Sequence, residues 1–304
     1  MSAVPADSWH QPVMTAEVLH YLNPRPGRVI VDGTVGTGGH SLAILPHLLP
    51  DGTLIAVDQD RDALDLAVRR LAEFAPQVTF RHGNFRHLPR ILSELGIAKV
   101  DGVVLDLGMS SLHVDRPERG FSFSKAGPLD MRMDTEQDAT ASALVNALSA
   151  DELAMILRTL GEERFARRIA QRIVQARPLQ TTAELADVVS RAVPASARYG
   201  RLHPATRTFQ ALRMAVNDEL GALEELLNAL REYLNPGARA VFITFHSLED
   251  RLVKHALAQG VREGRWRVLT KKPVRPSEAE VEQNLRARSA KLRAAAVPDE
   301  AGSA

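Results

Sequence analysis

The feature that most constrains the fold is an alternation of short apolar runs with helical patterns over the first third of the chain. Each run has the length of a buried strand, and apolar residues recur at helical spacing between the runs. Strands that alternate with helices predict βαβ units and a parallel sheet covered on both faces. The predicted strands are Arg28–Asp32, Thr53–Asp58, Val78–Arg81 and Val100–Leu107, and the helices are His40–Leu49, Ala63–Phe74 and Leu88–Leu95.

This alternation stops near Leu112. Residues 113–135 contain Gly and Pro without periodicity and predict an irregular loop. Helices follow, because Ser149-Ala-Asp-Glu152 and Thr181-Thr-Ala-Glu184 are capping boxes that precede apolar residues at helical spacing.

The sheet is predicted to resume in the last third of the chain. A long amphipathic helix from Ala205 to Leu234, with a break near Gly221, leads to a turn at Pro236-Gly237. Three more strands are predicted at Arg239–Phe245, Trp266–Thr270 and Ala290–Val297. The chain therefore predicts an α/β domain in two parts, residues 1–112 and 214–304, interrupted by a helical insertion at residues 113–213.

The first predicted strand ends in a glycine-rich loop, Asp32-Gly-Thr-Val-Gly-Thr-Gly38-Gly39-His40. Glycines at the start of a helix let backbone N–H groups approach a ligand closely. The spacing is not the G-x-G-x-x-G of dinucleotide-binding proteins, and the acidic residue before the glycines is similar to the first motif of S-adenosylmethionine methyltransferases.

The next three strands also end in groups that suit a nucleotide-type cofactor. Asp58 is placed to bind ribose hydroxyls, whereas Asp60 is better explained as a helix N-cap. Asn84 and Phe85 follow the third strand, where they would contact an adenine, although core packing is an alternative for Phe85. Asp106 ends the fourth strand, where methyl donor and acceptor should meet. Four such ends in order predict a cofactor site along one edge of the sheet.

Composition excludes several kinds of chemistry. The chain has no cysteine, which excludes disulfides, Cys-ligated zinc, iron–sulfur clusters and the thiolate attack used by cytosine C5 methyltransferases. No metal site is predicted. No apolar run approaches a membrane span and no secretory signal is evident, so we expect a cytoplasmic protein. Two basic blocks, within residues 158–213 and 251–304, suit a polyanion or are solvated helix faces.

These residues and the longer strings that follow them resemble one family, the small-subunit ribosomal RNA methyltransferase H, or MraW-type, cytosine-N4 methyltransferases. The matching strings span nearly the whole chain and are very specific. They are His10-Gln-Pro-Val-Met14, DGTVGTGGHS, DQD at 58–60, Asn84-Phe85, DLGMSS, Arg119-GFSFSKAGPLDMRMD134, Gly161-EERFARRIA170, His203-PATRTFQALRMAVNDEL220, Thr244-FHSLEDRLVK254 and Arg286-ARSAKLR293.

The resemblance implies a class I (Rossmann-like) S-adenosylmethionine methyltransferase sheet with an inserted all-helical domain that helps to bind RNA. The implied reaction methylates the exocyclic N4 amine of one cytidine in the decoding region of 16S rRNA. We expect the substrate to be the small ribosomal subunit, and the family suggests a homodimer. The implied cofactor contacts are Gly38, Gly39, His40, Asp58, Phe85, Asp106 and His113.

This sequence departs from the family pattern at two positions. His113 stands where the family usually has Gln, and Leu285 stands where it often has Pro. The first departure bears on a cofactor contact, although His can still donate one hydrogen bond. The second affects a local turn.

The mechanism is less fully specified. Cytosine N4 is a poor nucleophile, and positioning can supply much of the rate enhancement. Asp106 is the candidate catalytic residue, as an acceptor for the amine, although a contact with the cofactor is the stronger interpretation. No general base is evident, and His246 is interpreted as structural.

The loop at 113–135 offers two further groups. Phe121 and Phe123 would stack on a base or pack the loop onto the core. Asp130 and Arg132 are expected to pair.

One further candidate surface is the helical run of Arg164, Arg167, Arg168 and Arg172, which is either a phosphate-contacting face or a solvated one. Three other functions fit these residues less well. An NAD-dependent oxidoreductase requires the G-x-G-x-x-G turn that is lacking. A DNA or protein methyltransferase differs only in its acceptor. A non-catalytic RNA-binding protein would not need the loop, Asp58 and Asp106 together.

Overall fold

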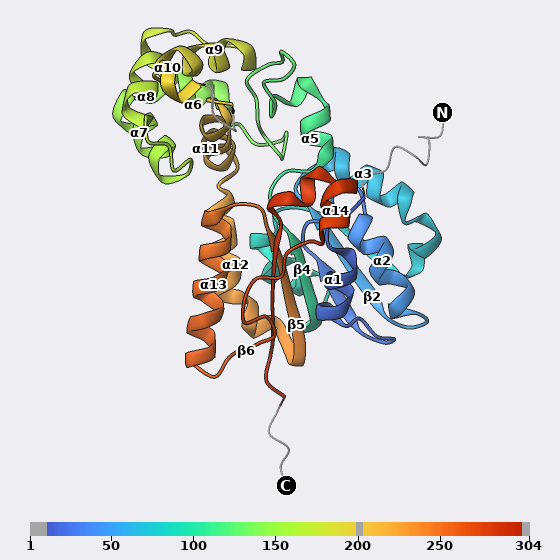
Figure 1. The fold of residues 1–304 in the computed structure, drawn as a ribbon. Coiled ribbons are helices and arrows are strands. Elements are labelled where there is room, and N and C mark those ends of the chain that lie inside the picture. The colour runs from blue at the N-terminus through green and yellow to red at the C-terminus, as the bar shows by residue number, and fades with distance from the viewer. Residues whose placement is uncertain (1–10, 199–202, 300–304) are drawn as a thin grey trace. The chain divides into compact units, whose positions relative to one another are not determined.

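A computed structural model describes residues 11–198 and 203–299 of the chain, which divides into two compact units. The first unit contains residues 1–108 and 220–304, and the second contains residues 109–219 (Figure 1). The chain thus leaves the first unit once and returns to it.

The first unit is built on a seven-stranded sheet in the order β3-β2-β1-β4-β5-β7-β6. Strands β3, β2, β1, β4 and β5 run parallel, β7 is antiparallel to β5, and β6 is antiparallel to β7. This confirms the predicted α/β class. The strands are β1 (Val29–Asp32), β2 (Thr53–Asp58), β3 (Val78–His82), β4 (Val100–Asp106), β5 (Leu234–Thr244), β6 (Arg267–Val268) and β7 (Lys291–Ala296).

Helices cover both faces of this sheet (Figure 1). The α-helices of the unit are α1 (Thr15–Leu22), α2 (Gly39–Leu48), α3 (Arg61–Arg70), α4 (Leu88–Glu94), α12 (Glu219–Ala229, whose first residue belongs to the second unit), α13 (Ser247–Arg262) and α14 (Glu278–Gln283). Short 3₁₀ helices lie at η2 (Ala72–Gln77), η3 (Phe85–His87), η5 (Leu230–Tyr233) and η6 (Leu285–Ser289).

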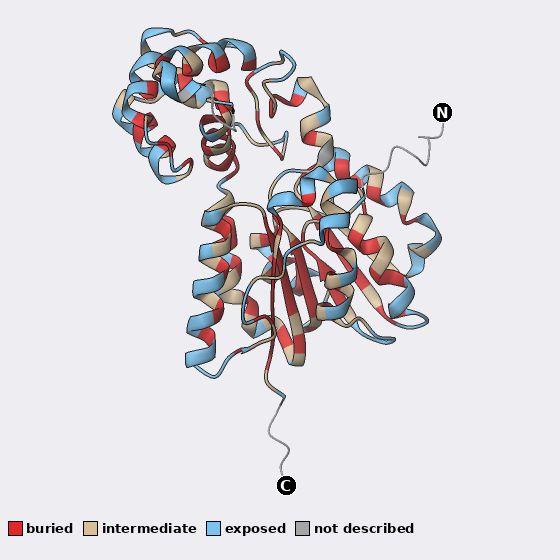
Figure 2. Cartoon of the chain, viewed as in Figure 1, coloured by how far each residue is buried: buried red, intermediate tan, exposed pale blue. Residues whose placement is uncertain are grey.

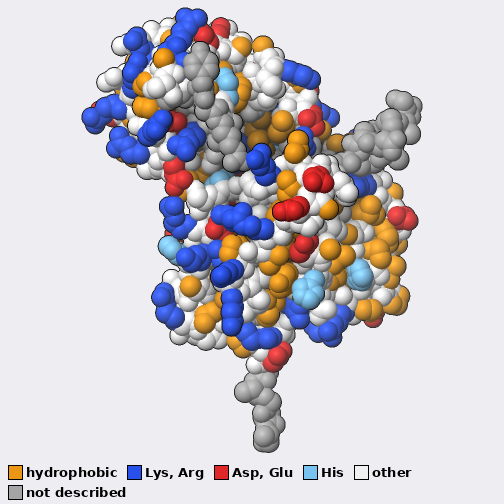
Figure 3. All heavy atoms as spheres, viewed as in Figure 1, with side chains coloured by type: hydrophobic (Ala, Val, Ile, Leu, Met, Phe, Trp, Pro, Cys, Tyr) orange, Lys and Arg blue, Asp and Glu red, His pale blue; other side chains and the backbone are white. Residues whose placement is uncertain are grey.

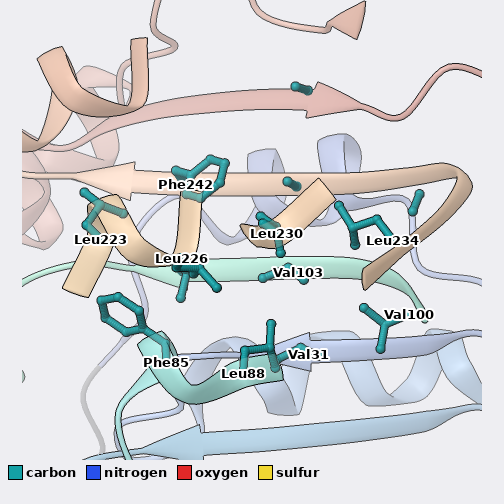
Figure 4. Packing of buried hydrophobic residues seen from close by; sticks show 14 of the residues in the cluster. Val31, Phe85, Leu88, Val100, Val103, Leu223, Leu226, Leu230, Leu234 and Phe242 are labelled. Carbon is teal, nitrogen blue, oxygen red and sulfur yellow. The ribbon is translucent and has the colours of Figure 1, made fainter. Parts of the chain in front are cut away.

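The alternation of side chains along the strands divides the core between the two faces. Val103 and Leu105 of β4 pack with α4, α12 and α13, whereas Val104 between them packs with α1 and α2. The same period of two holds for Phe242 and Ile243 on β5. Figure 4 shows the first of these clusters, and Figure 2 shows the buried residues concentrated on the strands. Both faces are therefore sealed, as continuous apolar strands predict.

The predicted turn at Pro236-Gly237 lies instead inside β5. The register against β4 jumps from Val100–Leu234 to Gly102–Arg239, so the extra residues form a bulge. Gly237 has a φ of 74°, and Pro236 has no N–H to give to the ladder. These two residues are the ones a strand irregularity tolerates.

The second unit is helical and has its own apolar core. It contains α5 (Ser111–Asp115), α6 (Ala141–Ala147), α7 (Ala150–Thr159), α8 (Ala166–Gln175), α9 (Thr182–Ala192), α10 (Ala195–Arg198), α11 (Thr206–Asn217) and the 3₁₀ helix η4 (Pro117–Arg119). The capping boxes predicted at Ser149 and Thr181 are confirmed at the starts of α7 and α9. The predicted loop at 113–135 is not wholly irregular, because α5 and η4 occupy its start.

The predicted long helix from Ala205 to Leu234 is wrong in its break and its end. It divides at Asp218, which adopts a left-handed conformation with φ 45°, and not at Gly221. Asp tolerates this conformation better than most residues. Asn217 holds the end of α11 by accepting from the Met133 amide at 2.7 Å and donating to the Met131 carbonyl at 2.8 Å. The end of the helix is therefore set by hydrogen bonds of Asn217 to residues far away in the sequence, which local periodicity does not show.

Candidate cofactor site

The carboxyl ends of four adjacent parallel strands carry the polar groups predicted for a cofactor site. Asp32 ends β1, Asp58 ends β2, Asn84 lies two residues beyond β3, and Asp106 ends β4. Parallel pairing in the order β3-β2-β1-β4 sets these ends along one edge of the sheet. This is the edge at which open α/β sheets bind ligands.

The glycine-rich loop between β1 and α2 has the backbone that glycine permits. Gly36 and Gly38 have φ of 52° and 85°, and Gly38 is the N-cap of α2. A Cβ on Gly38 would lie 3.3 Å from Leu71 Cγ, and one on Gly39 would lie 3.1 Å from Pro12. The loop is therefore packed from behind, and its amides are set at a helix N-terminus.

Two of the aspartates hold the loop in place. Asp32 is 1% exposed and accepts from Ser41 Oγ at 2.7 Å and from the Thr34 amide at 3.2 Å. Asp58 accepts from the Gly36 amide at 2.7 Å and from the Asp60 amide at 2.8 Å. Burial raises the pKa of Asp58 to about 7, although these two amide hydrogen bonds oppose the shift. Burial likewise raises the pKa of Asp32 above its ordinary value.

Asp60 is a helix cap, as predicted. Its carboxylate is 1% exposed and accepts from the amides of Asp62 and Ala63 at the start of α3. Because both partners are backbone groups of its own helix, Asp60 is committed to structure. Binding of a ribose by Asp58 stays a prediction.

Asp106 differs from the other aspartates in its hydrogen bonding. Its Oδ1 is buried and finds no hydrogen-bond partner among the residues that the structure describes. Its Oδ2 lies 3.8 Å from Nδ1 of His40. Burial raises the pKa of Asp106 to about 6, His40 opposes this, and the carboxylates of Asp32 and Glu249 add to it. A buried acceptor without a donor is costly and suits a ligand that brings one.

His40 is held toward Asp106 by the N-terminal segment. The imidazole is 6% exposed, and its Nε2 donates to the Val13 carbonyl at 2.8 Å. This bond fixes the ring with Nδ1 facing Asp106. The sequence did not show this contact, because the spacing from Val13 to His40 carries no local signal.

The two aromatic candidates lie in different units. Phe85 is 9% exposed and packs in the core between the sheet and α4, where Figure 4 shows its ring. His113 belongs to the second unit, where it is 4% exposed, accepts from the Ser110 amide at 3.1 Å and stacks on Phe121 with ring centroids 4.5 Å apart. Contacts of Phe85 and His113 with a cofactor stay predictions.

Several other predicted residues have structural roles. His246 caps α13 in a capping box with Glu249, as its structural interpretation predicted. Asp130 and Arg132 form the expected pair, with Nη2 and Oδ2 2.8 Å apart. Phe123 packs against the core of the second unit, beside Phe209.

Glu249 was missed by sequence reasoning. It is 2% exposed, accepts from the Phe245 amide at 2.9 Å and adds negative charge near Asp106. In the sequence it is an ordinary acidic residue in the first turn of a helix. Only the pairing of β4 with β5 brings it toward the site.

Comparison with known proteins decides the family. The family model described as the MraW methylase family matches residues 7–297. The chain belongs to this family. A relative from Syntrophotalea carbinolica, named ribosomal RNA small subunit methyltransferase H, is 51% identical over 94% of this chain and 96% of its own. One of the same name from Trichormus variabilis is 51% identical over 96% and 93%.

Similarity to solved structures is much weaker. An S-adenosylmethionine-dependent O-methyltransferase from Thermotoga maritima is 12% identical and has a TM-score of 0.44, with 96% of this chain and 68% of that chain covered. The family assignment rests on the sequence matches alone.

S-adenosylmethionine is the cofactor of this methylase, and the site fits it chemically. The cofactor carries a sulfonium and an ammonium, whereas a dinucleotide carries an anionic pyrophosphate. Ionised carboxylates at three adjacent strand ends, of which Asp32 is buried and Asp58 and Asp106 are half-buried, favour the cation and oppose the anion. Asp106 Oδ1 offers the unused acceptor that an ammonium requires.

No described helix is long and apolar enough to cross a membrane.

Proposed function

We propose that this enzyme methylates the exocyclic N4 amine of one cytidine in the decoding region of 16S rRNA. The observation that carries the proposal is the near-full-length match to relatives named ribosomal RNA small subunit methyltransferase H, at about half of all positions. The long strings shared with the cytosine-N4 family, from the glycine-rich loop to Arg293, support the finer assignment.

The chemistry required of the protein is mainly positioning. S-adenosylmethionine supplies an electrophilic methyl group, so the new bond joins carbon to N4 as the bond from carbon to sulfur breaks. The N4 lone pair is delocalised into the ring, so the amine must be held in line with the methyl group. The methylated ammonium is acidic enough to lose its proton to water. The chain has no cysteine for a covalent adduct and needs none.

In this proposal Asp58 holds the ribose, and Gly38, Gly39 and His40 form the wall of the site beside the methionine part of the cofactor. Asp106 accepts from the cofactor ammonium through the oxygen that has no partner among the described residues. The alternative is that this oxygen accepts from the amine of the cytosine. Both roles need the same ionised acceptor, with its buried Oδ1, at the end of β4.

The insertion at residues 113–213 is the part that we assign to RNA. It carries one of the two basic blocks, and the C-terminal residues carry the other. Two separate blocks exceed what a single small hairpin would need. We therefore propose the assembled small ribosomal subunit as the substrate.

The test is to incubate the enzyme with methyl-labelled S-adenosylmethionine and small subunits from a strain that lacks it, and then to identify labelled nucleosides. We expect label in N4-methylcytidine, and little from Asp106→Asn. Asp101→Asn, at the other end of β4, is the matched control that keeps activity. Label in another nucleoside would overturn the acceptor. Equal labelling of a short RNA hairpin would overturn the assembled subunit.

A further inference from the structure

The arginines of the second unit fall into two groups. Most are used by the fold, because each bonds a carboxylate or a backbone carbonyl. Members of this group are Arg119 with the carbonyls of Arg132 and Met133, Arg132 with Asp130, Arg177 with the carbonyls of Val145 and Leu148, Arg191 with Asp187, Arg198 with the Val193 carbonyl, Arg207 with the Glu162 carbonyl, and Arg213 with Glu219.

The arginines of α8 belong to the other group, as does Arg158 in the last turn of α7, which is also exposed. Arg167 and Arg168 are exposed and make no ion pair or hydrogen bond with any residue in 11–198 or 203–299. Arg172 donates to its neighbour Gln175 at 3.1 Å, and Arg164, which precedes the helix, lies over the ring of Phe165. None of these arginines forms an ion pair with a carboxylate among the described residues.

The geometry of α8 gathers these groups on one side. Its inward face is Ala166, Ile169, Ala170 and Ile173, each at most 2% exposed. At 100° per residue the outward face consists of Arg167, Arg168, Gln171, Arg172 and Gln175, which we call the α8 basic face. Arg164, predicted on the same helical run, precedes the helix and is not part of this face. Figure 3 shows Lys and Arg side chains prominent over the region of α7 and α8.

Neighbouring helices show what a merely solvated face looks like in this unit. The outward side of α9 mixes Glu184 and Asp187 with Arg191, and Asp187 pairs with Arg191 at 2.8 Å. In contrast, α8 contains no acidic residue at all. Arg168 and Arg172 stand at i and i+4, where like charges repel and destabilise the helix. A solvated face needs no such arrangement, whereas a surface for a polyanion does.

We propose that the α8 basic face binds the sugar–phosphate backbone of the RNA substrate. Guanidinium groups hold phosphates with two hydrogen bonds, and glutamine amides suit phosphate and 2′-hydroxyl oxygens. The ten-residue helix is about 15 Å long, enough for several successive phosphates of one strand. The inference rests on the proposed function only in taking RNA as the substrate, and it does not depend on which atom is methylated.

The test measures binding of the full-length enzyme to naked 16S rRNA and to small subunits at 50 to 200 mM salt. The variants are Arg168→Gln, the double variant Arg167→Gln with Arg168→Gln, and the control Arg191→Gln, an exposed arginine already paired with Asp187. Glutamine preserves helix propensity, and circular dichroism and S-adenosylmethionine affinity verify the fold.

We expect each α8 substitution to lower the slope of log K against log salt by about 1. The ratio of the wild-type binding constant to that of the double variant should then fall about 15-fold as salt rises from 50 to 200 mM. Arg191→Gln should leave the slope unchanged. If the α8 substitutions change the salt slope of binding no more than Arg191→Gln does, the proposal is overturned. Loss of binding to subunits but not to naked rRNA would also overturn it, in favour of a ribosomal protein partner.

The two proposals fail separately. Normal binding by the double variant, with N4-methylcytidine still produced by the wild-type enzyme, would refute the surface alone. A different methylated nucleoside, with binding still lost in the double variant, would refute the acceptor alone.

Discussion

Replacing Asp106 by asparagine should stabilise the cofactor-free protein and lower its affinity for S-adenosylmethionine. The folded state raises the pKa of this carboxyl from 3.8 to about 6, chiefly by burial. Each pKa unit corresponds to about 1.4 kcal/mol, so the ionised group costs the fold up to about 3 kcal/mol at neutral pH. The side chain is 27% exposed, so solvent screening reduces this to about 1–2 kcal/mol.

The pH dependence of this effect has a defined sign. Because its pKa is raised, the folded state holds the Asp106 proton at pH values where the unfolded chain has lost it. The contribution of Asp106 to stability therefore falls as pH rises from about 4 to about 6. The advantage of Asp106→Asn should be largest at pH 7.5 and shrink toward pH 5. Urea unfolding of the cofactor-free protein at several pH values measures it.

Cofactor affinity should move in the opposite direction. Asparagine keeps the shape of the side chain but removes its charge, and a hydrogen bond to a charged group contributes about 1.5–3 kcal/mol. The dissociation constant should therefore rise about 10- to 100-fold, as measured by calorimetry. A variant that is less stable than wild type and binds the cofactor equally well would refute the assigned role of Asp106.

Asp101 on the same strand provides the matched control. Burial works to raise the pKa of Asp101, but hydrogen bonds from the Val29 amide, Arg28 and Asn235 outweigh it and hold the pKa below its ordinary value. Asp101→Asn removes a favoured charge and should destabilise the protein by about 1–2 kcal/mol. Its cofactor affinity should not change.

Three further predictions concern the same edge of the sheet. Cofactor affinity should fall as pH is lowered from 8 to 6, because Asp58, with a pKa of about 7, and then Asp106, at about 6, take up protons; calorimetry that shows a flat profile would contradict this. Asp60→Ala should cost about 1 kcal/mol of unfolding free energy through loss of the α3 cap, with the affinity of the folded protein unchanged. Gly38→Ala should cost about 1–2 kcal/mol, because its φ is 85° and the new Cβ would press on Leu71; cofactor binding should weaken with it, and thermal unfolding with and without cofactor separates the two effects.

Local patterns sufficed for much of the fold. The bounds of β2 match the predicted ones, and the caps at Asp60, Ser149 and Thr181 were predicted because a cap depends on residues within one helical turn. The end of α11 at Asn217 was missed, because this end depends on bonds to Met131 and Met133, more than eighty residues away.

The same distinction holds for the site. The positions of Asp58 and Asp106 at strand ends were predictable because each follows an apolar run, and that signal is local; their contacts with the cofactor stay predictions. The orientation of His40 by Val13 and the approach of Glu249 toward Asp106 were not predictable, since both require segments far apart in the sequence to be packed together. Sequence patterns therefore nominate ligand groups, while tertiary packing sets their charge and direction.

The contrast among the three aspartates at adjacent strand ends argues that the site is built around a cation. Asp32 and Asp58 each accept two hydrogen bonds from protein donors, which oppose the rise in their pKa without cancelling it. Asp106 has an oxygen without a donor among the described residues and a second carboxylate, Glu249, that makes its ionisation harder. Selection for stability alone would replace Asp106 by a neutral residue. A positively charged ligand would relieve this cost, because its donor would satisfy the free Asp106 oxygen and its charge would favour the ionised carboxylate.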